Sequence, residues 1–143
     1  MALLHSMKLA AVLGCAVLLL AACGGGGGNA ATDEIKAAYR NFFTTKTSLA
    51  QHVALLENGE KFKPLIRTFL DLPGANGVSA TVSKVTMQGP DTAKVVYTVK
   101  VAGLSFPDRP GYAVRQNGKW KVTDSTLCGL IALSGDMPAA CNR

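Results

Sequence analysis

Acidic residues, aromatic residues and long apolar runs are all scarce in this 143-residue chain. Aromatic residues make up 6% of it, and 9 Asp and Glu stand against 15 Lys and Arg, which gives a formal net charge of +6. The longest uncharged apolar stretch, Leu9–Ala22, is shorter than the roughly 18 residues that a membrane-spanning helix needs. Length and composition therefore exclude a membrane bundle, a coiled coil, a collagen-like chain and a multidomain protein.

Sequence motifs of the common catalytic sites are also missing. No serine lies in a nucleophile-elbow pattern, and no glycine loop has the spacing that cradles a phosphate. His52 is the one histidine after residue 22, so neither a metal centre nor a cysteine–histidine pair is predicted. We therefore expect no metal, no cofactor and no catalytic residue.

The first 22 residues have the pattern of an export signal. Lys8 is the only charged residue among them, and an apolar stretch follows it; a signal peptide has about 7–15 apolar residues after a basic start. The stretch ends in Leu20-Ala21-Ala22-Cys23, which resembles the bacterial lipobox. The resemblance implies that Cys23 is diacylated and becomes the mature N-terminus; an ordinary signal peptide with a chance cysteine is the alternative. Met1 and Met7 both remain candidate start residues.

A glycine-rich linker, residues 23–31, follows the predicted signal peptide. Five consecutive glycines, Gly24–Gly28, favour no fixed conformation, and a linker of this length has an r.m.s. reach of roughly 15 Å. We therefore expect a single domain, residues 32–143, that is exported and held by lipid on the outer face of the cell membrane. Nucleic acid is not an expected partner of an exported chain with so few aromatic residues.

Four cysteines are present, and two of them remain for the folded domain. Cys15 leaves with the signal peptide, and Cys23 takes the lipid. Cys128 and Cys141 are then a single pair in an exported domain, where disulfides persist. In the chain-entropy model a loop of this size stabilises a fold by roughly 3 kcal/mol. We predict a Cys128–Cys141 disulfide.

Residues 32–70 have the apolar period of three successive helices. Thr32 is the predicted N-cap of the first helix, and a stripe of apolar residues follows it. Ser48 and Gln51 form a capping-box pattern that opens the second helix, which Asn58-Gly59 ends. The third helix contains Pro64, which we place in the first turn because a deeper proline removes a hydrogen bond. The first stripe consists of Ile35, Ala38, Tyr39, Phe42 and Phe43.

From Val78 onward the apolar period changes to two, which predicts β-strands. Val82 and Val85 are out of phase for one face of a regular strand, so we predict a β-bulge near Ser83-Lys84. A second alternating stretch follows, and then a looser segment, Gly103–Pro110, leads into the last two strands.

The last hairpin can close with a two-residue or a three-residue loop. A two-residue Asn117-Gly118 loop sets Trp120 opposite Arg115, whereas a three-residue loop pairs Trp120 with Val114. Pairing of apolar residues favours the three-residue loop, in which Tyr112 shares the inner face with Trp120. This register predicts a basic outer face that either attracts anionic lipids or wall polymers or is simply solvated. The face consists of Lys94, Lys100, Arg115, Lys119 and Lys121.

A short helix is predicted after the last strand, with Thr126 as its cap and Leu127, Leu130 and Ile131 pointing inward. Helices followed by an antiparallel meander give an α+β fold. We expect three N-terminal helices packed on a curved four-stranded antiparallel sheet, and a short C-terminal helix tied down by the disulfide.

Two resemblances extend this prediction. Three helices on a curved, bulged sheet resemble the nuclear-transport-factor-2-like, or cystatin-like, cone. The stretches Leu55–Gly59 with Phe62, Gly111–Val122 and Leu127–Cys141 resemble small exported actinobacterial lipoproteins related to the mycobacterial low-molecular-weight secreted antigen. These stretches supply turns, core and a disulfide, so the resemblance implies a location and a fold and no reaction.

Two kinds of function follow from a cone-like domain at the cell surface. The first is a non-catalytic binding module, which holds an apolar ligand in the cone or meets an envelope polymer or a protein partner. The second is a small isomerase or hydratase, for which Asp71 and Tyr97 are the candidate pair; His52 is expected at the surface. The oligomeric state stays open. Possible cavity-lining residues are Tyr39, Phe43, Tyr97, Tyr112 and Trp120.

Overall fold

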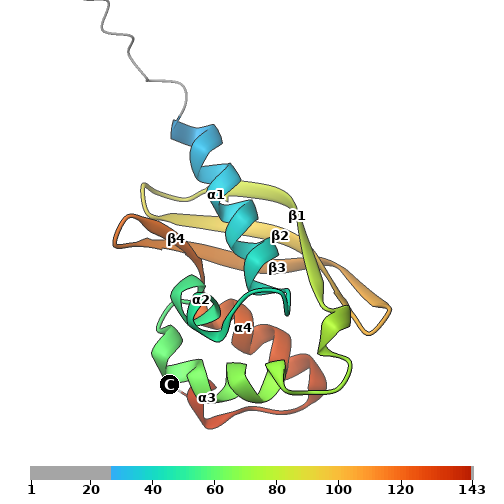
Figure 1. Cartoon of the computed structure of the whole chain (residues 1–143). Helices are drawn as coiled ribbons and strands as arrows, with labels where there is room; N and C mark the ends of the chain where they lie inside the picture. Colours follow the sequence, from blue (N-terminus) through green and yellow to red (C-terminus); the bar gives the residue numbers. More distant parts are fainter. Residues whose placement is uncertain (1–26, 143) are drawn as a thin grey trace, which may run out of the picture.

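The computed structural model describes residues 27–142, so the predicted signal peptide and Cys23 lie outside the described residues. Within this range the chain forms four α-helices and four strands, joined in part by short 3₁₀ turns (Figure 1). The helices are α1 (Gly27–Phe42), α2 (Leu49–Leu55), α3 (Gly59–Leu70) and α4 (Asp124–Ile131), and the strands are β1 (Ser79–Met87), β2 (Thr92–Val101), β3 (Leu104–Gln116) and β4 (Lys119–Val122). The predicted α+β fold is confirmed.

Helix α1 begins earlier than predicted. It runs from Gly27 through Asn29, so Thr32 lies inside the helix and is not its cap. Alanine has the highest helix propensity, and Ala31 packs against the core, which together extend the helix into the predicted linker. The segment between Cys23 and the first helix is therefore shorter than the sequence indicated.

The capping box of α2 is confirmed. The Ser48 hydroxyl accepts a hydrogen bond from the Gln51 backbone N–H (3.3 Å), and the Gln51 side chain accepts one from the Ser48 N–H (3.2 Å). Helix α3 starts directly at Gly59, which places Pro64 in the second turn and not in the first. That prediction was wrong, and the helix tolerates one missing hydrogen bond at this exposed position.

The sheet is antiparallel throughout, with the strand order β1-β2-β3-β4. The predicted bulge is confirmed, because the β1–β2 register shifts between Val82 and Lys84 around Ser83. The segment predicted to be looser, residues 103–110, belongs mostly to β3. A second register shift there, opposite Thr98, absorbs extra residues that include Asp108 at a φ of 51°.

The hairpin between β3 and β4 closes with two residues, so the predicted three-residue register was wrong. Trp120 pairs with Arg115, and Val122 pairs with Ala113. Both loop residues, Asn117 and Gly118, have positive φ (53° and 76°), as a tight type I′ hairpin requires. Ala113 and Val122 form the inner apolar pair, while the long side chain of Arg115 reaches solvent from the end of the strand.

One core fills the space between the helices and the inner face of the sheet. Helix α1 crosses this face and contacts both edge strands, β1 and β4, so the sheet curves around it (Figure 1). The largest fully buried side chains are Tyr39, Tyr97, Phe62, Ile35, Leu56, Val95, Val99 and Val122. Residues 27–142 contain this core, the sheet and the disulfide, which are elements typical of a folded domain.

The C-terminal segment is fixed by a cap and a disulfide. Thr123, not Thr126, caps α4, and its hydroxyl accepts a hydrogen bond from the Thr126 N–H (3.3 Å). The cap lies earlier than predicted because Thr126 turns inward, where its hydroxyl accepts from the Tyr112 N–H (2.8 Å). The predicted disulfide between Cys128 and Cys141 is confirmed, and it ties the tail back to α4.

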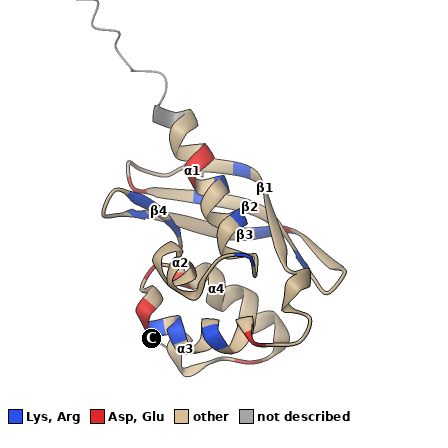
Figure 2. Cartoon of the chain, viewed as in Figure 1, with Lys and Arg blue, Asp and Glu red and all other residues tan. Residues whose placement is uncertain are grey.

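Basic residues occur on all four strands (Figure 2). The two-residue hairpin changes the predicted basic face. Arg115 pairs with the buried Trp120, so it occupies an inner position of the strand and is not part of the outer face. Lys84 takes its place, since the bulge brings it opposite Val96 on the outer side.

Candidate functional site: an apolar cavity between two helices

A cavity of about 550 Å³ lies between α3 and α4, within the usual range for small-molecule sites. Helix α3 contributes Leu65, Ile66 and Phe69 to its wall. Helix α4 contributes its half-buried apolar stripe, Leu127, Leu130 and Ile131. The end of α1 and the sheet complete the lining with Phe42, Phe43, Val78, Val101 and Phe106.

The mouth of the cavity is also apolar. Leu72 is 53% exposed, Leu133 is 50% exposed and Phe106 is 37% exposed, and all three line the cavity. They come from three different segments: the loop after α3, the turn after α4, and β3. Exposed apolar side chains that converge on a cavity from separate segments are typical of a binding site.

The two hydroxyl groups in the lining are already bonded within their own helices or turns. The Thr68 hydroxyl donates to the Pro64 carbonyl (3.0 Å), and the Ser134 hydroxyl donates to the Ile131 carbonyl (2.7 Å). A catalytic cavity needs at least two polar groups that converge on the substrate. These two hydroxyls instead satisfy the backbone, so the cavity offers a ligand an almost wholly apolar surface.

His52 is the remaining polar residue of the lining. We expected it at the surface, but it is 2% exposed. Its Nδ1 and Nε2 atoms lie 2.9 Å and 2.8 Å from the carbonyl oxygens of Ser48 and Thr44, and its ring packs edge-on against Phe42. The sequence did not predict this burial, because His52 lies next to the apolar position Val53 and not on the apolar stripe itself. His52 therefore connects the N-cap of α2 to the segment after α1, and its ring forms part of the cavity wall.

The five residues predicted to line a cavity lie in three different places. Phe43 lines the cavity between α3 and α4. Tyr39 and Tyr97 pack in the adjoining core with ring centroids 5.1 Å apart, and Trp120 is 5% exposed in the core below β4. Tyr112 is 42% exposed, because the two-residue hairpin turns it to the outer face of the sheet.

The candidate pair for isomerase chemistry does not converge on the cavity. Asp71 follows the last residue of α3 and is exposed, and neither it nor Tyr97 belongs to the lining. Burial raises the pKa of Tyr97 above the ordinary tyrosine value, with a smaller opposing effect from Arg109. Burial also raises the pKa of Tyr39, whose hydroxyl donates to the Tyr112 carbonyl at 2.8 Å. Both tyrosines therefore stay neutral well above physiological pH.

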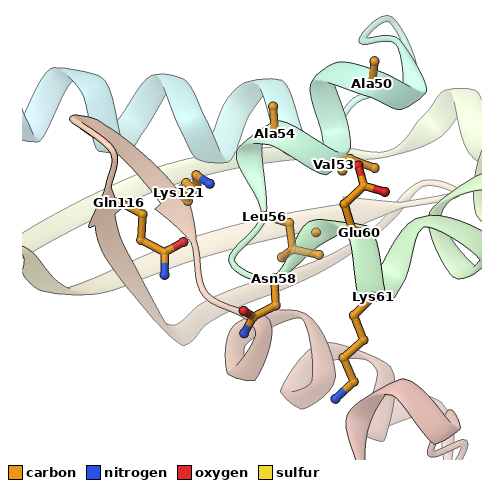
Figure 3. A pocket seen from close by; sticks show the side chains of 10 residues that line it. Ala50, Val53, Ala54, Leu56, Asn58, Glu60, Lys61, Gln116 and Lys121 are labelled. Carbon is orange, nitrogen blue, oxygen red and sulfur yellow. The ribbon is translucent and has the colours of Figure 1, made fainter.

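A second, shallower hollow of about 630 Å³ lies between the α2–α3 junction and the β3–β4 hairpin (Figure 3). Gln116 and Lys121 line one side of it, and Glu60 and Lys61 line the other. Figure 3 shows Glu60 and Lys61 pointing in opposite directions. Because these polar groups do not meet at a common point, we do not assign a ligand to this hollow.

Residues 27–142 contain neither a cluster of metal ligands nor a membrane-spanning helix. No group of three or more histidine, cysteine or carboxylate side chains in this range is placed to hold a metal ion. In the same range, no helix has both the length and the apolar character to cross a membrane.

Fold and cavity together define a small α+β domain with an apolar cavity and the Cys128–Cys141 disulfide. The family model for the C-terminal domain of the low molecular weight antigen MTB12 matches residues 29–138. The chain therefore belongs to the MTB12 family of secreted antigens. No curated protein matches the chain.

Proposed function

We propose that this domain binds an apolar ligand in the cavity between α3 and α4, without catalysis, at the outer surface of the cell membrane. The observation that carries the proposal is the lining itself, in which apolar side chains from α1, α3, α4 and the sheet surround about 550 Å³. The three polar side chains among them are occupied by backbone groups. A neutral hydrocarbon chain or ring system suits such a surface, because binding it leaves no polar group unpaired.

A lipid on Cys23 is the second part of the proposal. Helix α1 starts at Gly27, so the segment from Cys23 spans at most roughly 14 Å when fully extended. The lipobox-like sequence before Cys23 and the apolar stretch ahead of it support this anchor. The domain is then held close to the membrane surface, where apolar ligands are concentrated.

Binding of a neutral fluorescent probe tests the cavity. We expect N-phenyl-1-naphthylamine, which carries no charge, to bind saturably with one molecule per chain. Replacing Ile131 with Trp fills part of the cavity from a half-buried wall position, and we expect it to weaken binding at least tenfold.

The matched control is Leu104→Trp. Leu104 is 65% exposed on β3 and is not part of the lining, so this variant adds the same ring outside the cavity. Probe binding that does not saturate, or that both substitutions weaken equally, contradicts the proposal. Native mass spectrometry of protein purified from its host then identifies any ligand that the cavity retains.

A further inference from the structure

The outer face of the sheet carries a regular group of lysines. Cross-strand pairing places one lysine of β1, two of β2 and two of β4 on the side away from α1. The lysines of β2 and β4 alternate with buried residues, and the lysine of β1 pairs with the outward Val96. Four of the five are exposed, and the fifth, Lys121, is partly exposed. We call this surface the lysine face. Its lysines are Lys84, Lys94, Lys100, Lys119 and Lys121.

No carboxylate occupies a paired outward position of the four strands; Asp108 of β3 lies unpaired in the bulge opposite Thr98. The other outward positions of the paired strands hold Ser, Thr, Val, Pro, Tyr and Gln. None of the five lysines forms an ion pair with a residue of the described range, where the ion pair that does occur joins Lys63 and Glu60 on α3. The lysine face therefore carries five positive charges, none of which is held in an ion pair with a residue of the range 27–142.

Apolar side chains lie between the lysines. Tyr112 is 42% exposed and pairs with Lys94, and the partly exposed Val114 pairs with Lys121. Val96 pairs with Lys84 in the same way. A tyrosine and valines among flexible lysines suit an interface with headgroups above and acyl chains below, since each kind of side chain finds its own environment.

We propose that the lysine face docks on a bilayer that contains anionic phospholipids. Charge complementarity favours an anionic partner, and the exposed Tyr112 favours a bilayer over a soluble polyanion, which offers no apolar layer. Lysines suit this contact because they act as hydrated point charges and need no fixed geometry. Docking does not depend on the cavity, and the anchor proposed at Cys23 adds only proximity.

Cosedimentation with vesicles tests the docking. The protein is the chain from residue 23 with Cys23→Ser, which lacks the lipid and retains every helix and strand of residues 27–142. We expect it to bind vesicles of phosphatidylcholine with phosphatidylglycerol at low ionic strength, and not vesicles of phosphatidylcholine alone. Binding falls steeply as salt is added, because surface charges are screened.

Two triple variants distinguish the effect of the lysine face on vesicle binding from the effect of net charge alone. Replacing Lys84, Lys94 and Lys121 with Gln removes three charges from the lysine face, and we expect binding about 100-fold weaker. The matched control replaces Lys36, Lys46 and Lys61 with Gln, which removes three charges from exposed positions off the sheet. We expect the control to bind within a few-fold of the unchanged protein.

Tyr112→Ser separates a bilayer from a soluble polyanion. We expect it to weaken vesicle binding several-fold and to leave binding of inorganic polyphosphate unchanged. The proposal is overturned by equal loss in the two triple variants, by equal binding to both kinds of vesicle, or by no binding at all. It is also overturned if polyphosphate binds tightly while Tyr112→Ser leaves vesicle binding intact, because the partner is then a polymer.

Discussion

Gly111 lies on β3 where buried side chains of the core crowd against the strand, and replacing it with alanine tests how closely that core is packed. The added Cβ would lie 2.5 Å from the Tyr39 hydroxyl oxygen, 2.9 Å from Cε1 of Tyr97 and 3.1 Å from a Thr126 methyl carbon. Tyr39 is fully buried, and its hydroxyl donates to the Tyr112 carbonyl at 2.8 Å. The substitution therefore has to push the Tyr39 ring and its hydrogen bond out of place.

The expected loss of stability is a balance of three effects. Overpacking a core costs about 1–3 kcal/mol, and weakening the hydrogen bond of Tyr39 costs about 1 kcal/mol. Replacing glycine with alanine returns about 0.5–1 kcal/mol, because the unfolded chain becomes less flexible. We expect Gly111→Ala to lower the free energy of unfolding by about 2 kcal/mol.

Urea denaturation measures this change, with the fluorescence of the buried Trp120 as the signal. In the double variant Tyr39→Phe/Gly111→Ala the closest clashing atom is gone, so we expect the two losses to be less than additive. Gly129→Ala is the control: a Cβ at Gly129 on α4 meets no atom within 4 Å, and alanine favours a helix. A neutral Gly111→Ala, or fully additive losses in the double variant, refutes the packing argument.

Two further predictions concern the anchor and alkaline pH. Cys23→Ala should leave an uncleaved or mis-sorted precursor and abolish partition into detergent; a variant that partitions like the unchanged protein refutes the lipid anchor. Burial raises the pKa of Tyr39 above its ordinary value of 10.0, so above about pH 10 the unfolded chain loses a proton that the folded chain keeps. The free energy of unfolding should therefore fall by about 1.4 kcal/mol per pH unit from this residue, and urea titrations of Tyr39→Phe between about pH 9 and 11 should show a shallower fall.

Local patterns predicted much of the fold because their physical causes are local. Ser48 and Gln51 have the three-residue spacing at which each side chain bonds the other's backbone N–H. The apolar alternation of β1 changes phase between Val82 and Val85, where the bulge lies. The predicted β3–β4 register was wrong because it depended on an apolar pair of Trp120 with Val114, whereas the apolar pair that forms is Ala113 with Val122. An arginine at the end of a strand can sit opposite a buried tryptophan, since its long side chain reaches past the edge of the core.

The cavity between α3 and α4 could not be predicted from the same patterns. The apolar stripe of Leu127, Leu130 and Ile131 was predicted to point inward, and it does line the space between α3 and α4. The sequence pattern of an inward apolar stripe is the same whether the facing helix packs directly against it or lies farther away and leaves a cavity. The separation of α3 and α4 depends on contacts far apart in the sequence, and the burial of His52 depends on where α1 ends.

The two edges of the sheet have a consequence for crowded surfaces. An unpaired strand edge can recruit another chain, and proteins fixed to one membrane meet each other often. At one edge, β4 is only four residues long, and Leu56 pairs with Val122 beside it while the Glu57 N–H donates to the Val122 carbonyl (2.8 Å). At the other edge, the bulge at Ser83 interrupts β1 midway. Beyond β4, the edge of β3 is interrupted by its own bulge, which contains Asp108. None of these edges offers a long straight template, so copies that the proposed anchor brings together on one membrane should remain separate molecules.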